Sequence, residues 1–575
     1  MSDRAPDRKS LMSLTPEKVY AAVTTGSMAP PAKDLTDQQR RDVAEYLGGR
    51  LLDLTDTGSA DKMPNRCANN PGFTVADHSN LSKEPSWNGW GADDANTRSQ
   101  NARTAGLSAA QVPQLKLKWA FGFPKGDTAF GQPTLAGGRI FVGSDNGYVY
   151  SLDAKTGCVH WSFHARSGVR TAPVVAPATD HGHAVYLGDL RANAYALDAA
   201  TGKQLWMAEL SDHYTARITA APAIYEGHLY FGISAMEEAF SAAPSYECCT
   251  FRGSVVALDS HTGKQTWRTY VIPEEPKPVR KNSAGTQLWA PAGAAIWNTP
   301  TIDAKRRLLY VGTGDAYTEP ASKNSDAVVA IDLESGKIAW SFQAVPKDAW
   351  MVGCVPQATE NCPKDLGVDW DFGSSPILVA LGSGKQILLA TPKSGTVFAL
   401  DPDHEGKVLW SVNLAEKPAP NNGQIAFGGA ADSQRAYIAL EDGRFASIDL
   451  EAGKLAWITR LESLDDLGKP TINGENRTKA GLRFGQSAAV TEIPGAVFIG
   501  GWDGILRALS TADGKILWQF NTARDFKCVN DIACKGGSMG GPGVTVVDGM
   551  VYAPSGYANV GGGMPGNVLL AFSTK

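Results

Sequence analysis

Short runs of alternating apolar and polar residues fill most of the chain beyond residue 115. In one stretch QPTLAG (132–137), RIFVGSD (139–145) and YVYSLD (148–153) follow one another and lead into a fourth run that contains a tryptophan. Alternation with a period of two predicts strands, and the brief polar breaks between runs predict tight turns. The pattern therefore predicts four-stranded antiparallel units, the form of a β-propeller blade.

One phrase closes seven of these units. It reads ALDAATGKQLW in one copy, and the seven copies end at Trp161, Trp206, Trp267, Trp340, Trp410, Trp457 and Trp518. Its Asp can bond the backbone of its own turn, and its Gly tolerates a positive φ. Because repeats of this kind are stable only when they pack on their neighbours, we assign these tryptophans to packing between blades.

The two ends of the region 115–575 supply an eighth blade. The C-terminal runs GVTVVDG, MVYAPSG and NVLLAFS provide three strands, and LKLKWAFGF around Trp119 provides the missing tryptophan strand. Pairing of the first strand with the last would close the ring and remove its exposed edges. The sequence thus predicts an all-β, eight-bladed propeller over residues 115–575.

Residues 1–52 carry no propeller pattern and predict two helices instead. The second begins after Thr36 with Gln39 three residues later, the signature of a capping box. The segment between the helices resembles the axial-methionine loop of a class I cytochrome c, with Met28 as the ligand. Since the chain has no C-x-x-C-H motif, we interpret 1–52 as a partial cytochrome c-like segment and expect no haem c on this chain. Residues 53–114 are predicted to form a linker that wraps the propeller.

The charge balance and the cysteines limit the possible binding partners and the cellular compartment. Fifty-four basic against 59 acidic residues give a net charge of −5, which disfavours nucleic-acid binding, and no apolar run is long enough to span a membrane. Six of the eight cysteines fall in local pairs, which predicts disulfides and an oxidising compartment, whereas the partners of Cys67 and Cys158 stay open. The polar start MSDRAPDRKS lacks an export signal, so we expect a periplasmic or secreted protein whose N-terminus is truncated.

Three insertions interrupt the repeat, at 235–253 in blade 3, 316–326 in blade 4 and 345–373 between blades 4 and 5. All lie between neighbouring blades, and we expect them to build one wall over one face of the ring. The innermost strands begin with polar residues that point into the central channel, namely Arg170, Arg217, Thr219, Trp297, Asn298, Asp371 and Gln486. Such a set could hold a flat polyanion with the indole as a stacking surface, or it could simply bind channel water.

These segments resemble the eight-bladed quinoprotein alcohol dehydrogenases, which use pyrroloquinoline quinone (PQQ). The likeness covers residues 80–575 and rests on GISAMEE with CCTFRGSVVALD, on GAAIWNTPTID with LLYVGTGD, on DWDFGSSP and on ATPKSGTVFALD. In this order the motifs are most similar to the polyvinyl-alcohol dehydrogenase branch. The resemblance implies PQQ and Ca²⁺ as cofactors.

The resemblance also implies site residues. Glu237, five residues after Gly232, matches the family's metal-binding Glu, with Glu238 and Glu247 as close competitors. Asp315 in GTGD stands where the family usually has Asn, which adds a charge but keeps a hard oxygen ligand suited to Ca²⁺.

The remaining matches concern the quinone and the substrate. Asp371 matches the catalytic base, with Asp369 and Glu238 as the next candidates, Lys393 in PKSG matches the cation beside the quinone carbonyls, and Trp297 matches the stacking residue. Relatives cover the other quinone face with a vicinal disulfide, and Cys248-Cys249 is such a pair at a different position.

The resemblance implies that secondary alcohols, including polymers such as polyvinyl alcohol, are oxidised to ketones. Asp371 would take the hydroxyl proton as hydride passes to quinone C5, and a separate cytochrome c would take the electrons. A PQQ dehydrogenase of other alcohols or sugars, or a non-catalytic propeller scaffold, are the alternatives. A scaffold has no reason to retain Glu237, Asp315, Asp371 and Lys393 together.

Overall fold

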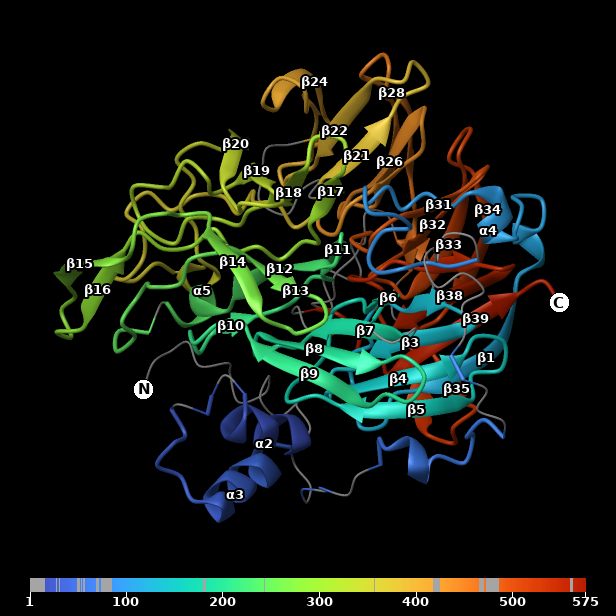
Figure 1. The fold of residues 1–575 in the computed structure, drawn as a ribbon, viewed down its shortest axis with the longest axis horizontal. Helices are drawn as coiled ribbons and strands as arrows, with labels where there is room; N and C mark the ends of the chain where they lie inside the picture. Colours follow the sequence, from blue (N-terminus) through green and yellow to red (C-terminus); the bar gives the residue numbers. More distant parts are fainter. Residues whose placement is uncertain are drawn as a thin grey trace.

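A computed structural model describes residues 16–26, 28–29, 31–48, 52, 54, 57–68, 72–73, 85–178, 182–241, 243–355, 357–416, 425–464, 470–471, 485–558 and 562–575. Eight antiparallel sheets follow one another around a ring, so that the colours of Figure 1 pass in sequence order from cyan to red. We number these sheets as blades 1 to 8 in the order of their innermost strands. Most strands are short, and the inner ones are buried along their whole length because each blade packs between two neighbours.

The first four blades contain the strands β2 to β14 and β17 to β20. Blade 1 comprises β2 (Thr134–Ala136), β3 (Arg139–Gly143), β4 (Tyr148–Asp153) and β5 (Val159–His164), and blade 2 comprises β6 (Val174–Pro177), β7 (His183–Gly188), β8 (Asn193–Asp198) and β9 (Gln204–Glu209). Blade 3 comprises β10 (Ala216–Arg217), β11 (Ala223–Tyr225), β12 (His228–Ala235), β13 (Ser254–Asp259) and β14 (Gln265–Tyr270). Blade 4 comprises β17 (Thr301–Asp303), β18 (Leu308–Gly312), β19 (Ala327–Asp332) and β20 (Ile338–Gln343).

The other four blades complete the ring. Blade 5 comprises β21 (Ile377–Ala380), β22 (Gln386–Ala390), β23 (Thr396–Asp401) and β24 (Lys407–Asn413), and blade 6 comprises β25 (Ala430–Ala431), β26 (Arg435–Ala439), β27 (Arg444–Asp449) and β28 (Lys454–Arg460). Blade 7 comprises β31 (Thr491–Ile493), β32 (Ala496–Gly500), β33 (Ile505–Ser510) and β34 (Ile516–Asn521). Blade 8 comprises β37 (Thr545–Val547), β38 (Met550–Ser555), β39 (Val568–Ser573) and β1 (Lys116–Gly122).

Three two-stranded hairpins project from the blades. They are β15 (Lys277–Lys281) with β16 (Gln287–Ala290), β29 (Ser463–Leu464) with β30 (Pro470–Thr471), and β35 (Asp525–Lys527) with β36 (Ala533–Lys535). The hairpin β15–β16 stands out furthest at the left of Figure 1, and all five residues of β15 are exposed.

The ring is closed by the pairing of β1 with β39. The two strands run antiparallel, with Trp119 opposite Ala571 and Phe121 opposite Leu569, and they lie side by side in Figure 1. This pairing confirms the predicted eight-bladed propeller closed by its terminal strands.

The repeated tryptophan packs on a turn glycine of the next blade at seven of the eight junctions. Trp161 of blade 1 donates from its indole nitrogen to Ala199 O of blade 2 at 3.0 Å, and its ring lies against Gly202 in the β8–β9 turn. The same contact recurs between Trp206 and Gly263, Trp267 and Gly336, Trp340 and Gly406, Trp410 and Gly453, Trp457 and Gly514, and Trp119 and Gly157. All of these glycines have a positive φ. The predicted packing role of the tryptophans is thus confirmed.

The three insertions pack against one another on one face of the ring. Helix α5 (Glu237–Phe240) in the blade 3 insertion contacts the 3-10 turn η5 (Val352–Cys354). The Asn361 amide donates to Ser241 O at 2.9 Å, and Lys364 N donates to the Glu319 carboxylate at 2.9 Å. Two of them lie within blades 3 and 4, between β12 and β13 and between β18 and β19, and not between neighbouring blades as expected, but together the insertions form the predicted wall.

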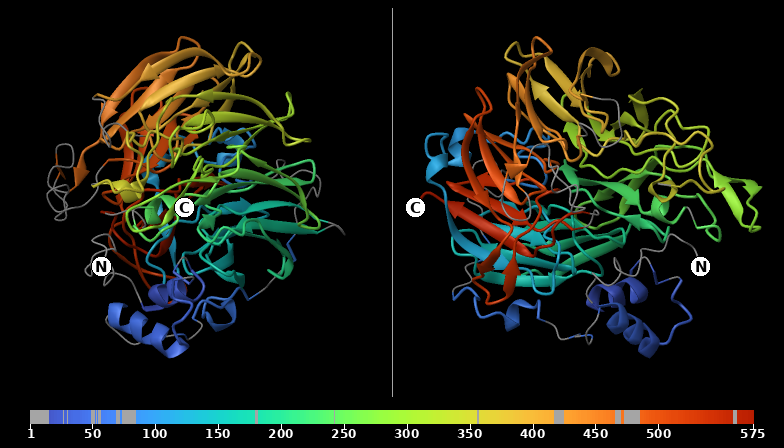
Figure 2. Two further views of the ribbon diagram at one scale, coloured as in Figure 1. Left: turned by 90° about the vertical axis from the view of Figure 1, so that its left-hand side faces the viewer. Right: turned by 180° about the vertical axis from the view of Figure 1, so that it is seen from behind.

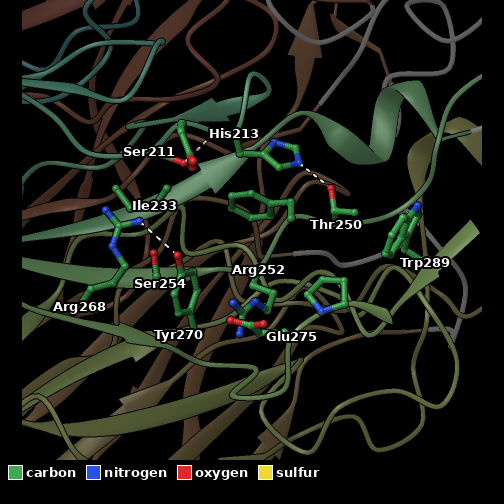
Figure 3. Close-up of a pocket in the computed structure, with 13 residues that line it drawn as sticks. Ser211, His213, Ile233, Thr250, Arg252, Ser254, Arg268, Tyr270, Glu275 and Trp289 are labelled. Atoms are coloured by element: carbon green, nitrogen blue, oxygen red, sulfur yellow. Dashed lines mark hydrogen bonds between the residues drawn. The ribbon is translucent and has the colours of Figure 1, made fainter. Parts of the chain in front are cut away.

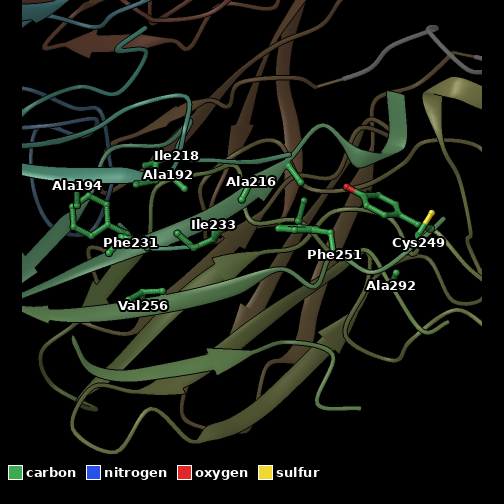
Figure 4. Packing of buried hydrophobic residues seen from close by; sticks show 14 of the residues in the cluster. Ala192, Ala194, Ala216, Ile218, Phe231, Ile233, Cys249, Phe251, Val256 and Ala292 are labelled. Carbon is green, nitrogen blue, oxygen red and sulfur yellow. The ribbon is translucent and has the colours of Figure 1, made fainter. Parts of the chain in front are cut away.

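Four disulfides are present among the described residues. Three link the local pairs Cys248–Cys249, Cys354–Cys362 and Cys528–Cys534, as predicted. The fourth joins Cys67, beside the 3-10 turn η1 (Ala60–Lys62), to Cys158 of blade 1. Figure 4 shows Cys249 and Phe251 close to Ala292 in the apolar cluster under the wall.

Residues 87–101 form a segment that crosses the innermost strands at one end of the channel. Backbone oxygens of Asp94, Ala95 and Thr97 accept hydrogen bonds from blades 4, 5 and 6, at Ile302, Leu378 and Ala431. Arg98 is fully buried and donates to Val490 O and to the Gln132 side chain. This crossing segment is followed by α4 (Ala102–Ala105) and η3 (Val112–Gln114), which lead into β1.

Helices α2 (Pro16–Thr24) and α3 (Asp37–Gly48) lie outside the ring in both views of Figure 2. Thr36 and Gln39 exchange the two hydrogen bonds of the predicted capping box, at 2.8 and 3.2 Å. Lys18 of α2 forms ion pairs with Asp127 and Asp145 of the propeller. Within the described part of the chain, no helix is long and apolar enough to cross a membrane.

The tryptophan contact predicts a specific cost for one glycine. A Cβ at Gly202, where φ is +74°, would lie 2.6 Å from the Trp161 ring, whereas a Cβ at Gly138, where φ is +72°, would meet no atom within 4 Å. Both Gly→Ala variants carry the backbone cost of about 1–2 kcal/mol, but only Gly202→Ala adds overpacking of about 1–3 kcal/mol. We expect Gly202→Ala to lower the thermal unfolding temperature clearly more than Gly138→Ala, as measured by circular dichroism. Equal shifts would contradict a packing role for this turn.

Candidate functional site

The central channel contains a cavity at the start of the innermost strands. Arg170, Thr219 and Trp297 line it, as predicted, and they are joined by Trp90 from the crossing segment and by Phe427. The Trp297 ring lies edge-to-face with Phe427, at a centroid distance of 6.0 Å. A Cβ on Gly373 would lie 2.0 Å from the Trp297 ring, so this position has no room for a larger residue. The indole is therefore held in a fixed place in the cavity wall.

Two arginines make this end of the channel positive. Burial, together with the charge of Arg170, lowers the pKa of Arg217 to about 10. The Arg170 guanidinium also lies over the Phe427 ring, 5.4 Å from its centroid. Guanidinium groups bind carboxylates through paired hydrogen bonds, so an anion with several carboxylates fits this region.

Buried polar atoms of the innermost strands also lack partners. Thr219 Oγ1 and both polar side-chain atoms of Gln486 are buried and form no hydrogen bond with any described residue. Buried polar groups are nearly always satisfied in native proteins, so these atoms indicate a polar ligand or ordered water. The arginines, the fixed indole and the unsatisfied groups together fit PQQ, a flat tricarboxylate.

Asp371 and Lys393 meet beside Trp297. The Trp297 indole nitrogen donates to Asp371 Oδ2 at 2.9 Å, and Lys393 Nζ lies 2.7 Å from Asp371 Oδ1 and also bonds the Asp369 carboxylate. Lys393 Nζ lies 5.1 Å from the centroid of the Trp297 ring. The structure thus brings together the predicted base, the predicted cation and the predicted stacking residue.

The charges of Lys393 and the neighbouring carboxylates affect one another's pKa values. Burial alone would lower the pKa of Lys393, but the carboxylates of Asp371, Asp369 and Asp315 raise it well above its usual value. Burial raises the pKa of Asp369 to about 6, against the lowering effect of Lys393. Lys393 is therefore a permanent cation in this site.

Acidic groups gather next to Lys393 at the end of blade 4. One oxygen each of Asp315, Asp369 and Asp371 lies within 4.8 Å of the others, and the same holds for Asp315, Asp326 and Asp348. Burial and the neighbouring carboxylates Asp371 and Asp326 raise the pKa of Asp315 well above its usual value. An oxygen-only set of this kind suits a hard cation such as Ca²⁺.

The structure separates the three candidate glutamates. The buried Glu237 carboxylate accepts hydrogen bonds from Tyr246 Oη at 3.0 Å and from the backbone nitrogens of Thr250 and Phe251 at 2.8 Å, so it is occupied in holding the blade 3 insertion. The Glu238 carboxyl is instead affected by the charges of Lys393, Asp369 and Asp371. Burial raises the pKa of Glu238 to about 8, with Lys393 lowering it and Asp369 and Asp371 raising it. Glu247 is exposed. Glu238 therefore lies within reach of the charges of Lys393, Asp369 and Asp371.

The vicinal pair Cys248–Cys249 lies in the apolar cluster under the wall. Its sulfur atoms lie 4.0 and 3.7 Å from Met351 Sδ, and Tyr317 belongs to the same cluster. Burial and the charges of Glu238, Glu237 and Asp315 raise the pKa of Tyr317 well above its usual value. Tyr317 thus belongs to the apolar cluster of the disulfide and lies within reach of the charges of the acidic group.

A second hollow on blade 3 contains none of the predicted site residues. It has a volume of about 290 Å³ and is lined by residues that include His213, Thr250, Arg268 and Tyr270. His213 Nε2 lies 3.1 Å from Thr250 Oγ1 and forms a hydrogen bond with it. Figure 3 marks this bond with a dashed line. This hollow is distinct from the channel cavity.

Several residues of the site escaped the sequence analysis. Trp90, Phe427, Asp326 and Asp348 lie in loops or connections that no repeat phrase marks. Asp326 and Asp348 nevertheless lie within insertions that interrupt the repeat, Asp326 just before β19 and Asp348 beyond β20. Their proximity to Asp315 depends on how these insertions fold.

Comparison with known proteins agrees with this geometry. The family described as glucose/ethanol/alcohol dehydrogenase, beta-propeller domain, matches residues 87–434, and the outer membrane protein assembly factor BamB family matches residues 393–523. The polyvinylalcohol dehydrogenases of Pseudomonas sp and of Sphingopyxis sp. (strain 113P3) are 40% and 38% identical to this chain. Each alignment covers 99% of this chain and 90% of the relative.

Solved structures share the fold. The quinohemoprotein alcohol dehydrogenase from Comamonas testosteroni superposes with a TM-score of 0.62 at 20% identity, over 86% of this chain and 81% of that one. A europium-containing methanol dehydrogenase superposes with a TM-score of 0.60 at 18% identity, over 86% of this chain and 99% of that one. With its match to the alcohol dehydrogenase propeller and its full-length relatives, the chain belongs to the PQQ-dependent, or quinoprotein, alcohol dehydrogenase family.

Proposed function

We propose that this protein oxidises secondary alcohols to ketones in the channel cavity, with polyvinyl alcohol or similar polymers as the substrate class. The observation that carries the proposal is the contact of Asp371 with both Trp297 and Lys393, next to the positive end of the channel. The choice of substrate class rests on the polyvinylalcohol dehydrogenases that align with nearly the whole chain.

The binding roles follow from the side chains. Arg170 and Arg217 would bind the carboxylates of PQQ, Thr219 would donate a hydrogen bond, and Trp297 would support one face of the ring system. Cys248 and Cys249 would contribute indirectly, by keeping the wall of insertions rigid. When bound, PQQ supplies an electrophilic carbonyl carbon that accepts the hydride of the alcohol.

Asp371 would act as the general base that accepts the hydroxyl proton of the alcohol. Its carboxylate is buried and is oriented by the Trp297 indole and the Lys393 ammonium group, so it can receive the hydroxyl proton of an alcohol within hydrogen-bond reach. Lys393 places a fixed positive charge where negative charge grows on the acceptor oxygens. Because the site is buried, these charges act in a medium of low dielectric constant and their effect is stronger.

A divalent cation, Ca²⁺ in this proposal, would be held by Asp315 and Glu238, with Glu237 as the second candidate. Its chemistry is that of a Lewis acid that polarises the acceptor carbonyl. Burial and, after it, the neighbouring carboxylates raise the pKa values of Asp315 and Glu238, and a bound cation would stabilise their charged forms.

Electrons must then leave to another protein, for which we propose a separate cytochrome c in the periplasm. The chain contains no C-x-x-C-H motif, and Met28 is exposed. The helices α2 and α3 are therefore proposed as a cytochrome c-like segment without its own haem.

Replacing the two glutamates separates their roles. We expect Glu238→Gln to raise the Ca²⁺ concentration needed for half-maximal alcohol oxidation by 10-fold or more, because a charged ligand is lost. Glu237→Gln should leave that concentration within a few fold of wild type but lower the unfolding temperature, because its carboxylate bonds two backbone nitrogens. Activity is measured after treatment with EDTA and reconstitution with PQQ and graded Ca²⁺. The opposite pattern would return the ligand role to Glu237.

Asp371→Asn removes the base and keeps the shape. The asparagine oxygen can still accept the hydrogen bond from Trp297, so PQQ binding should persist while turnover falls by about 10²–10⁴-fold. Turnover with a secondary-alcohol panel and an artificial electron acceptor tests this, with bound PQQ measured by absorbance. Near-normal turnover would place the base elsewhere, with Asp369 and Glu238 next in line.

Haem attachment gives a third test. Produced together with a cytochrome-maturation system, this 575-residue chain should show no covalent haem, because two thiols and a histidine in C-x-x-C-H spacing are absent from its sequence. Haem staining of a denaturing gel and the reduced α-band measure it. A haem signal on the chain would overturn the proposed separate acceptor.

A further inference from the structure

Two buried carboxylates next to Asp315, those of Asp326 and Asp348, have no role in the proposed reaction. Asp315 follows β18, Asp326 immediately precedes β19, and Asp348 lies beyond β20 in the insertion between blades 4 and 5. One oxygen atom of each lies within 4.8 Å of the others. Three elements far apart in the blade thus converge on one point.

The three side chains are buried and incompletely satisfied. Their exposed fractions are 3% for Asp315, 0% for Asp326 and 3% for Asp348. Asp315 Oδ1, both oxygens of Asp326 and Asp348 Oδ2 form no hydrogen bond within the parts of the chain that the structure describes. Leaving a buried carboxylate without any partner costs several kcal/mol, so native proteins pair such groups or use them to bind metals.

The neighbouring cation does not fill this role. Lys393 forms its ion pairs with Asp369 and Asp371. The charged groups that act on Asp326 are Asp348 and Asp371, which are carboxylates themselves. Within the part of the chain that the structure describes, no basic side chain forms an ion pair with Asp326 or Asp348.

We propose that Asp315, Asp326 and Asp348 form a second cation site, separate from the one proposed beside PQQ and joined to it through the shared residue Asp315. All three ligands are carboxylate oxygens, and neither His nor Cys belongs to the group, which favours Ca²⁺ over Zn²⁺ or Cu²⁺. The backbone nitrogen of Val368 donates to Asp348 Oδ1 at 3.1 Å and leaves Oδ2 to face the other two side chains. The ligand set is therefore already oriented.

This second cation would connect the loop before β19 to the insertion that carries Asp369 and Asp371. Asp348 lies in this insertion and is bonded to its far end through Val368. A cation held there would fix the position of the catalytic base without touching substrate. The inference rests on the proposed function only through the shared residue Asp315.

The test is the calcium content of the protein. After reconstitution with PQQ and Ca²⁺ and removal of free ions, we expect plasma mass spectrometry to find two calcium ions per wild-type chain. Asp326→Asn should hold one, with its PQQ content unchanged. Position 326 has a φ of +51°, a conformation that Asn tolerates well, so this variant keeps the backbone.

The control is Glu334→Gln, which removes an exposed carboxylate from the same blade and should still bind two ions. Asp348→Asn is the second test variant and should also lose one ion. Without PQQ, Ca²⁺ should raise the unfolding temperature of the wild type and have a much smaller effect on Asp326→Asn, so a failure of PQQ binding would not hide the site. Equal calcium content in wild type, Asp326→Asn and Asp348→Asn would overturn the proposal and indicate that the carboxylates share protons instead.

Discussion

The contact between a tryptophan of one blade and a turn glycine of the next holds the ring together. Each indole needs a flat surface, and only a residue without a Cβ leaves room for it, while the positive φ of the same turn also favours glycine. The contact fixes the angle between neighbouring blades and hence the width of the channel. The positions of Arg170, Trp297 and Asp371 around the axis depend on this spacing, although none of them takes part in the contact.

The site concentrates negative charge against a single ammonium group. Asp369 and Asp371 pair with Lys393, Asp315 and Glu238 lie within reach of its charge, and Asp326 and Asp348 adjoin Asp315, so burial strengthens the mutual repulsion of these carboxylates. Such an arrangement is stable only when cations or protons compensate it. The insertions that carry most of these residues are tied together by Asn361, by Glu319 and by the disulfide Cys354–Cys362. The wall thus opposes the repulsion that the site creates.

The repeat made most of the fold predictable, because one phrase encodes the turn, the glycine and the tryptophan of seven blades. The capping box at Thr36 and the local cysteine pairs were predictable for the same reason, since their partners are near in sequence. The Cys67–Cys158 pair spans 91 residues and had no such signal. Spacing alone also did not distinguish Glu237 from Glu238, because the direction of two adjacent side chains depends on the orientation of the short helix α5. The insertions that contain Asp326 and Asp348 were visible as breaks in the repeat, but the packing that brings these two carboxylates to Asp315 was not.

Closure of the ring by β1 and β39 also sets an order of events during biosynthesis. Strand β1 emerges early from the ribosome, but its partner is about 450 residues later, and until then the apolar stretch KLKWAFG is an unpaired edge. Edges of this kind promote aggregation, and distant pairings form slowly. The crossing segment likewise has its partners on blades 4 to 7, so the cavity does not exist in a partly made chain. Cofactor loading is therefore a step that follows completion of the whole polypeptide, in whichever compartment the ring closes.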